Sequence, residues 1–317
     1  MFQPDSQRLR DLLPFAQLIP ALRQAFIDGA SVPLRHSHGI GAGSDAGTSL
    51  LMPAWDEAFY GVKIVNIYPG NAARGLPGLH STYVLHDALT GVPLALLDGN
   101  EITSRRTAAA AALAASFLAR ADATRLLVVG AGRVGSLVAP AMAEVRSLTD
   151  IAIWDIDPAA ARRCAATLCD AGFPGHAVAE LEPAVRSADI VSCATLATSH
   201  LIESGWLAPG SHLDLIGSFT PAMTEAAPAC FAQAEVWVDT AEAAVKSGDL
   251  LNAFATGCLT PEAIIGDMVA LCRGECAGRS SEQQRSIFKA VGTALEDLAA
   301  ARLAYRGRSD CIFSGRS

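Results

Sequence analysis

The segment Arg125–Gly135, RLLVVGAGRVG, constrains the fold of this chain more than any other stretch. Leu126–Val129 is a short apolar run rich in branched side chains, which is typical of a strand buried on both faces of a parallel sheet. Gly130, Gly132 and Gly135 follow with the spacing G-x-G-x-x-G, and a helical pattern begins directly after them. In a dinucleotide-binding fold these glycines make the tight turn, admit the pyrophosphate and let helix and strand pack closely.

A second short apolar run and an acidic residue follow the glycine motif. Ile151–Trp154 is predicted to be the next strand, and it ends at Asp155. This carboxylate comes about 20 residues after the glycines, where a dinucleotide-binding fold places the acid that binds the ribose hydroxyls. Arg133 and Val134 stand at the helix start, where free N–H groups and the helix dipole favour phosphate. The alternative is a glycine-rich turn in an unrelated α/β protein.

Strands and helices alternate from Asp122 onwards, whereas strand follows strand in the first part of the chain. The alternation predicts an α/β fold with a doubly wound parallel sheet, and the first part predicts a mixed or antiparallel sheet. Ligands bind beyond the carboxyl ends of parallel strands, so the loops Ala194–Ser199 and Gly217–Thr220 are expected to line the site. Two further helices are predicted over Pro221–Ala227 and Glu282–Arg306. The loop residues expected to contact the cofactor are Ala194, Thr195, Gly217 and Ser218.

Three cations in the first part of the chain are candidate ligands. Lys63 lies on a predicted strand between apolar neighbours, where it is either functional or a solvated lysine on an open face. Arg105 and Arg106 follow Thr103 and Ser104, either of which can cap a long alanine-rich helix. Two cations in a first helical turn are unfavourable by a few tenths to about 1 kcal/mol. Their compensating anion is either a substrate carboxylate or phosphate, or an acid close by in the sequence.

Composition excludes several classes of protein. The 317 residues are 51% apolar with a net charge of −8, which disfavours a nucleic-acid-binding surface. No apolar run reaches the ~18 residues that span a bilayer, and the start of the chain lacks a signal-peptide layout. We therefore expect a soluble, cytoplasmic protein with no membrane partner. The eight cysteines form no C-x-x-C pair, so we expect free thiols and no metal site.

Several stretches spread over nearly the whole chain match a known family. They are LLMPAW, GVKIVNIYPGN, GLPGLHSTYVL, TGVPLALLDGNEITSRRTAAAAALAA, VVGAGRVG, IGSFTPAMTE and FKAVGTALEDLAAA, in the family's order. The chain therefore resembles the ornithine cyclodeaminase/mu-crystallin family. The resemblance implies a Rossmann domain, residues 121–283, inserted after a mixed α+β substrate-binding and dimerisation domain, residues 1–120 plus 284–317. It also implies a homodimer.

The resemblance also implies the chemistry. Family members act on small α-amino or α-imino acids with a nicotinamide cofactor. By motif, the residues that bind the substrate carboxylate match Arg35, Lys63 in GVKIV and Arg106 in SRRTAA. A guanidinium can orient a carboxylate with two parallel hydrogen bonds. Lys63 is also the candidate catalytic residue, because a lysine whose pKa is lowered by neighbouring cations can donate a proton to an imine nitrogen.

One residue departs from the cyclodeaminase pattern. Where that pattern, G-G-D-x-P-G-K-x-E, has its acid, the segment GSFTPAMTE has Phe219, and Glu225 matches a structural helix position. A phenyl ring transfers no proton, and general acid–base groups contribute about 10²–10⁴-fold to a rate. We therefore expect an NAD(P)H-dependent reductase of a small cyclic α-imino acid, of the ketimine or pyrroline-2-carboxylate type. The alternatives are ornithine cyclodeaminase itself, an amino-acid dehydrogenase, and a non-catalytic nucleotide-dependent binder like mu-crystallin.

Asp155 also predicts which nicotinamide cofactor is used. A carboxylate at that strand end binds both ribose hydroxyls and repels a 2′-phosphate. Family members that use NADP tend to carry Asn followed by Arg at this place, whereas this chain has WDIDP. We therefore expect NAD(H) to be preferred over NADP(H).

Overall fold

A computed structural model describes residues 1–43 and 46–309 of the chain. It divides into two compact units, Met1–Arg106 with Thr293–Ser317, and Thr107–Gly292. The domain bounds expected from the sequence, 1–120 with 284–317 and 121–283, follow the same order along the chain and differ from this division at both junctions. Within the described ranges, no helix is long and apolar enough to cross a membrane.

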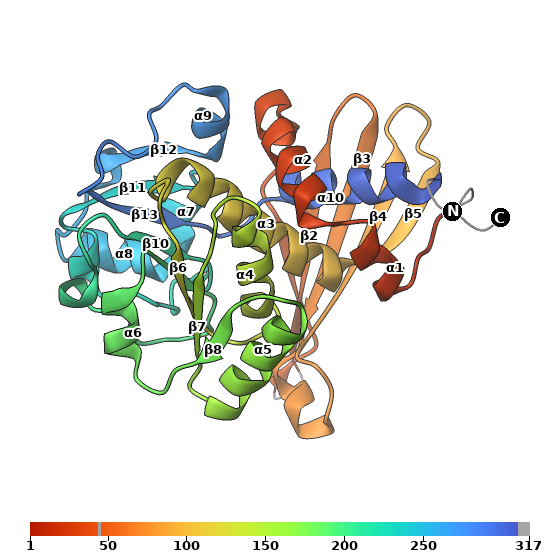
Figure 1. The fold of residues 1–317 in the computed structure, drawn as a ribbon. Coiled ribbons are helices and arrows are strands. Elements are labelled where there is room, and N and C mark those ends of the chain that lie inside the picture. The colour runs from red at the N-terminus through yellow and green to blue at the C-terminus, as the bar shows by residue number, and fades with distance from the viewer. Residues whose placement is uncertain (44–45, 310–317) are drawn as a thin grey trace, which may run out of the picture. The chain divides into compact units, whose positions relative to one another are not determined.

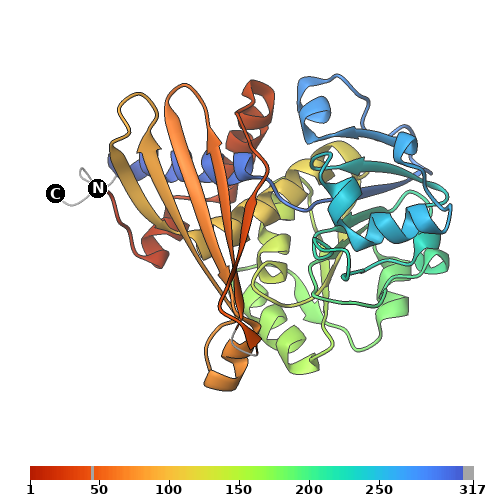
Figure 2. The same ribbon diagram turned by 180° about the vertical axis from the view of Figure 1, so that it is seen from behind.

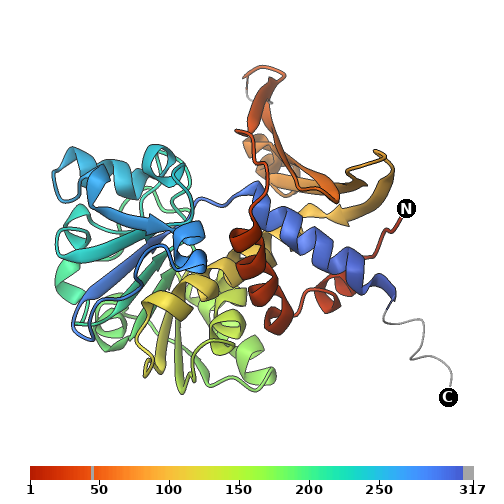
Figure 3. The same cartoon turned by 90° about the horizontal axis from the view of Figure 1, so that it is seen from above.

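The first unit is built on a five-stranded sheet in which every neighbouring pair is antiparallel. The sequence pattern had left a mixed or an antiparallel sheet open, and the five strands form the antiparallel one; an isolated parallel bridge joins Phe2 to Ala95 of the last strand. Helices α2 (Phe15–Asp28) and α10 (Ala294–Arg306) pack together beside the sheet, as Figures 2 and 3 show. The strands, in sheet order, are β1 (His36–Ile40), β2 (Gly47–Trp55), β3 (Phe59–Ile67), β4 (Leu79–Asp87) and β5 (Pro93–Asp98), and a short helix, α1 (Ser6–Asp11), packs near β5.

Side chains on β3 alternate between the two faces of this sheet. Gly61, Lys63 and Val65 are buried, whereas Val62 and Ile64 are half-buried. The contacts between β3 and helix α10 are made on the buried face, because Lys63 pairs there with an acid of that helix. The period of two therefore places an apolar row and a lysine-bearing row on opposite faces.

Helix α3 (Gly99–Leu118) begins earlier than the sequence predicted. Asp98 Oδ1 accepts hydrogen bonds from the N–H groups of Asn100 and Glu101 and so caps the helix. Thr103 and Ser104, the predicted caps, instead donate their hydroxyl protons to carbonyls four residues earlier within the helix. The two arginines that follow therefore lie beyond the first turn, and the predicted conflict with the helix dipole was wrong.

The second unit is a doubly wound α/β fold, as predicted (Figure 1). Its eight strands are all parallel and lie in the order β12-β11-β13-β10-β9-β6-β7-β8. The chain runs outward from β6 to β8 and then returns to β9 on the other side of β6, so the order reverses between β6 and β9. The strands are β6 (Arg125–Val129), β7 (Asp150–Trp154), β8 (Gly175–Ala177), β9 (Ile190–Cys193), β10 (His212–Leu215), β11 (Ala234–Val238), β12 (Ile264–Asp267) and β13 (Arg285–Lys289). The helices are α4 (Gly135–Ala143), α5 (Pro158–Asp170), α6 (Leu181–Ser187), α7 (Ala243–Lys246), α8 (Gly248–Ala255) and α9 (Met268–Arg273).

Two predicted helices differ from the structure, one over part of its length and the other throughout. Glu282–Arg306 is not one helix: β13 occupies its first part and pairs with both β10 and β11, and α10 follows. Pro221–Ala227 is an irregular loop. Its N–H groups at Glu225 and Ala226 donate to the side chain of Asp249, so tertiary hydrogen bonds replace the helical ones.

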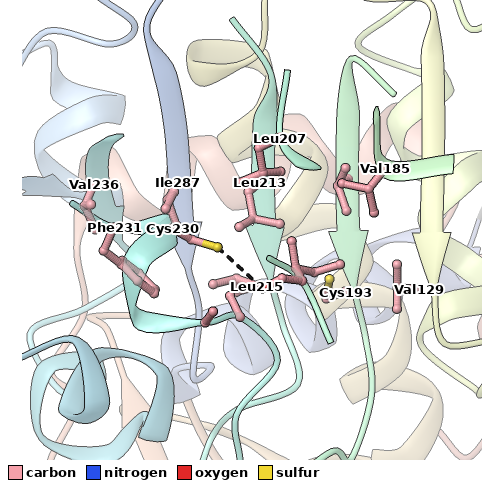
Figure 4. Packing of buried hydrophobic residues seen from close by; sticks show 14 of the residues in the cluster. Val129, Val185, Cys193, Leu207, Leu213, Leu215, Cys230, Phe231, Val236 and Ile287 are labelled. Atoms are coloured by element: carbon pink, nitrogen blue, oxygen red, sulfur yellow. Dashed lines mark hydrogen bonds between the residues drawn. The ribbon is translucent and has the colours of Figure 1, made fainter. Parts of the chain in front are cut away.

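The core of the second unit lies along the central strands. Figure 4 shows Leu213 and Leu215 of β10 in the same cluster as Ile287 of β13. The Cys230 thiol, also in this cluster, donates to the carbonyl oxygen of Ile202. The strands in this core are short and apolar because both faces of the sheet are covered. All seven cysteines in the described part of the chain are free thiols.

Candidate functional site

Two of the predicted cations meet a pair of acids in the first unit. Lys63 of β3 and Arg106 of α3 both contact Asp297 in the first turn of α10. The Lys63 Nζ to Asp297 Oδ2 distance is 2.7 Å, and Arg106 Nε lies 3.0 Å from Asp297 Oδ1. Glu296 completes the cluster, with its Oε2 atom 2.6 Å from Arg106 Nη1. Three elements that are distant in sequence thus hold one buried ion-pair cluster.

Burial makes this cluster electrostatically unusual. Lys63 is 2% exposed and Arg106 is 6% exposed. Burial lowers the pKa of Lys63 to about 8, although Asp297 acts in the opposite direction. Burial also opposes ionisation of Asp297, but Lys63 and Arg106 outweigh it and lower the pKa of that carboxyl. Asp297 is therefore an anion at neutral pH, and Lys63 is a cation that can release its proton near neutral pH.

The anion that was expected to compensate Arg106 comes from the protein. Glu296 and Asp297 both bind Arg106, and neither acid is close to Arg106 in sequence. Within the described ranges, Arg106 Nη2 donates to no protein acceptor, so one edge of the guanidinium remains for a ligand. Arg105 contacts other parts of the first unit instead of this cluster. Its Nε donates to the Leu13 carbonyl, and its guanidinium lies 4.5 Å from the Phe15 ring centroid.

Arg35, the third predicted carboxylate ligand, precedes β1 and is half-buried. Its role stays a prediction. Asp297 and Glu296 were not predicted from the sequence, because the segment that holds them was predicted as a helix without site residues. The signal that could have found them is a pair of adjacent acids inside the apolar run ALEDLAAA. Buried acids are rare unless they are paired.

The glycine motif lies at the reversal of strand order in the second unit. Gly130 has φ of +102°, and a Cβ atom there would lie 2.7 Å from the Ala194 carbonyl oxygen. A Cβ on Gly135 would lie 1.8 Å from the Gly130 carbonyl oxygen, so helix α4 packs directly on the turn. A Cβ on Gly132 would meet nothing within 4 Å. The first and third glycines therefore serve the turn and the packing, and the second faces open space.

This arrangement fits a dinucleotide. Within the described part of the chain, the N–H groups of Gly132, Arg133 and Val134 donate to no protein acceptor, and they stand at the start of α4. Such groups bind phosphate. Asp155 follows β7, and its carboxylate accepts from the N–H groups of Ala131 and Asp157. Each carboxylate oxygen retains a lone pair for a ribose hydroxyl.

The loops after β9 and β10 are joined by a buried side chain. Glu225 Oε1 accepts from the Thr195 N–H at 2.7 Å, and Glu225 Oε2 accepts from the Gly217 N–H at 2.7 Å. Ser218 is fully buried and its hydroxyl donates to the Met223 carbonyl, so its expected contact with a cofactor stays a prediction. Glu225 lies in a loop, and its assignment to a helix was wrong.

Phe219 follows these loop residues and is 41% exposed. Its N–H donates to the Gly217 carbonyl in a tight turn. The ring therefore reaches solvent at the carboxyl edge of the sheet. Across the described residues, no group of three or more metal-ligating side chains gathers here or elsewhere.

Comparison with known proteins places the chain in a family. The sequence model of the ornithine cyclodeaminase/mu-crystallin family matches residues 12–310. The Delta(1)-pyrroline-2-carboxylate reductase of Paracoccus denitrificans is 36% identical over 289 residues, 90% of this chain and 90% of that protein. The ornithine cyclodeaminase of Agrobacterium fabrum is 32% identical over 266 residues, 83% of this chain and 73% of that protein.

A solved structure agrees with these matches. Delta(1)-pyrroline-2-carboxylate reductase of Thermococcus litoralis, in complex with NADH and L-proline, superposes with a TM-score of 0.90 at 30% identity. The superposition covers 96% of this chain and 97% of that one. The chain belongs to the ornithine cyclodeaminase/mu-crystallin family.

Proposed function

We propose that this protein is an NADH-dependent reductase of a small cyclic α-imino acid of the pyrroline-2-carboxylate type. The observation that carries the proposal is the buried pair of Lys63 and Arg106 on Asp297, with the pKa of Lys63 lowered to about 8. Reduction of a preformed imine needs a cationic group that binds the substrate carboxylate, a hydride and one proton. NADH, when bound, supplies the hydride.

The residues of this chain divide the remaining tasks. Arg106, with Lys63 and Arg35, binds the substrate carboxylate. Asp297 and Glu296 fix the guanidinium through its Nε and Nη1 atoms, so Nη2 keeps a defined direction. Lys63 donates its proton to the imine nitrogen as the C=N bond becomes a C–N bond, and the product is the cyclic amino acid. A lysine pKa close to the working pH suits a general acid.

The experiment that tests this function compares two reactions of the purified protein. NADH absorbance is followed with pyrroline-2-carboxylate, and ammonia is followed with NAD and L-ornithine. We expect rapid NADH oxidation and no ammonia, because Phe219 cannot act as the deaminating acid. Ammonia release from L-ornithine would replace our proposal by ornithine cyclodeaminase. Tight binding of a ligand without turnover of any imino or amino acid would replace it by a binding protein.

We also propose that NAD(H) is preferred over NADP(H). The Asp155 carboxylate stands at the end of β7 and would repel a 2′-phosphate. We expect the Kd for NADH to be about tenfold or more below that for NADPH, and Asp155→Asn to narrow this ratio. Asp157→Asn is the matched control, because Asp157 is an exposed acid two residues away that caps α5. Equal affinities of the unmodified protein for NADH and NADPH would contradict this preference.

The protein is further proposed to form a homodimer through the face of the antiparallel sheet that lies opposite Lys63. Pro53, Val62, Val84 and Leu96 form a half-buried apolar row across four neighbouring strands. Light scattering should give twice the mass of one chain, and Val62→Glu should reduce this to one chain. A monomeric unmodified protein would contradict the proposal.

A further inference from the structure

We propose that Glu225 is a positioning residue that sets the spacing of the two cofactor-binding loops after β9 and β10. This inference rests on the proposed NADH site. Glu225 does not touch the substrate or the reacting atoms in this proposal. It acts through the backbone of Thr195 and Gly217, which are two of the four loop residues expected to meet the cofactor.

The carboxylate of Glu225 uses both oxygens to join the loops. Oε1 accepts from the Thr195 N–H at 2.7 Å and from the Thr195 hydroxyl at 2.8 Å. Oε2 accepts from the Gly217 N–H at 2.7 Å. The side chain is fully buried, so water does not compete for these bonds. One carboxylate thus links the ends of two neighbouring parallel strands.

The close approach requires glycine at position 217. A Cβ atom there would lie 2.2 Å from the Thr195 carbonyl oxygen and 2.3 Å from Glu225 Oε1. The two loops are therefore held nearer to each other than any side chain at position 217 would allow. The close spacing of the two loops therefore depends on glycine at position 217, and the Glu225 carboxylate lies directly beside that glycine.

A second layer of buried polar groups anchors Glu225 itself. Asp249, at the start of α8, accepts from the N–H groups of Glu225 and Ala226 at 2.7 and 3.1 Å. Its other oxygen lies 3.4 Å from Nζ of Lys289, which is fully buried at the end of β13. The Glu225 carbonyl accepts from the N–H groups of Leu201 and Ile202. Glu225 is thus fixed to α8, to β13 and to the segment after β9.

The two oxygens give a sharp test, because an amide cannot replace them. In Glu225→Gln the side chain has one acceptor oxygen and one NH₂ donor. Whichever way the amide turns, its NH₂ faces a backbone N–H at Thr195 or Gly217, and that link is lost. Fluorescence titration of the full-length protein with NADH should show a Kd raised about tenfold or more. The KM for NADH should rise likewise, while the KM for the imino acid changes little.

Asp214→Asn is the matched control. Asp214 is also a fully buried acid in the second unit, but it accepts from Ser192 on the neighbouring strand, and among the described residues no hydrogen bond joins its side chain to either loop. The Kd of the Asp214→Asn protein for NADH should match that of the unmodified protein. Gly217→Ala changes the loop spacing without changing any charge, and it should weaken NADH binding as Glu225→Gln does. If Glu225→Gln does not fold, Gly217→Ala still tests whether the spacing of the two loops governs NADH binding.

The outcomes separate this inference from the proposed function. Burial raises the pKa of Glu225 to about 7, so the titrations are run above that value, where the carboxylate is ionised. Folded Glu225→Gln and Gly217→Ala proteins that bind NADH as tightly as the unmodified protein would overturn the inference. Equal weakening by Asp214→Asn would also overturn it, because buried charge alone would then be responsible. Failure of the unmodified protein to bind NADH would instead refute the proposed function.

Discussion

Replacing Arg106 by alanine is expected to reduce kcat/KM for pyrroline-2-carboxylate by about 10³-fold, because the substrate carboxylate loses its guanidinium partner. The same change leaves Glu296 and Asp297 without their shared cation in a buried site. Removal of one partner of a buried ion pair costs about 3–5 kcal/mol of folding free energy. Activity is therefore measured at a temperature where circular dichroism shows the variant to be folded.

A substrate without a carboxylate distinguishes loss of carboxylate binding by Arg106 from loss of protein stability in the Arg106→Ala variant. The unmodified protein should reduce 1-pyrroline far more slowly than pyrroline-2-carboxylate, and Arg106→Ala should lose most of this discrimination. Arg105→Ala is the control, since the neighbouring arginine contacts Leu13 and Phe15 and should leave the discrimination unchanged. An Arg106→Ala protein that still prefers the carboxylate substrate by the original factor would rule out our assignment.

Local patterns predicted the architecture well. The branched apolar run and the glycine spacing led to β6, the turn at Gly130 and α4. The hairpin of β4 and β5 is equally local, because the Asp87 side chain stabilises its turn by accepting from the N–H groups of Leu89 and Thr90. These features depend on interactions between residues close in sequence, which is why composition and spacing reveal them.

Long-range partners could not be predicted in the same way. Arg106 and Asp297 are 191 residues apart, and only the packing of α10 on the sheet brings them together. Strand β13 was read as helix because SIFKAV suits either structure, and its pairing with β10 and β11 decided the outcome. Glu225 was placed on a helix because its hydrogen bonds to Thr195 and Gly217 leave no local signal. Each miss is a case in which tertiary hydrogen bonds outweighed local propensity.

Both units use the same physical device. In each, a buried acid holds the groups that are proposed to bind ligand: Asp297 holds two cations, and Glu225 holds two backbone loops. A buried charge that is fully hydrogen-bonded has few alternative positions, since each departure exposes an unpaired group. Such groups are costly to bury and are suited to fix a binding geometry before the ligand arrives.

Replacing Lys63 by methionine is expected to lower kcat for imine reduction by about 10²–10⁴-fold, because the imine nitrogen loses its proton donor. The donor is the ammonium form, whose pKa burial lowers to about 8. Above that value the protonated fraction falls with rising pH, so kcat/KM of the unmodified protein should fall by about tenfold per pH unit. Below it the ammonium is fully formed, and Lys63 should impose no further pH dependence.

The pH profile of Lys63→Arg distinguishes Lys63 from the substrate as the source of this decline. A cyclic imine also loses a proton as the pH rises, and that step would limit the rate whichever side chain is present. An arginine stays protonated throughout the measured range, so a decline caused by Lys63 should disappear in the variant, even where the rate is lower. The same decline in Lys63→Arg, or a Lys63→Met protein with the original kcat, would assign the proton to another donor. If the decline at high pH disappears in Lys63→Arg and the activity is lost in Lys63→Met, then the Lys63 ammonium is the acid of the reaction. Asp297 holds this ammonium at 2.7 Å.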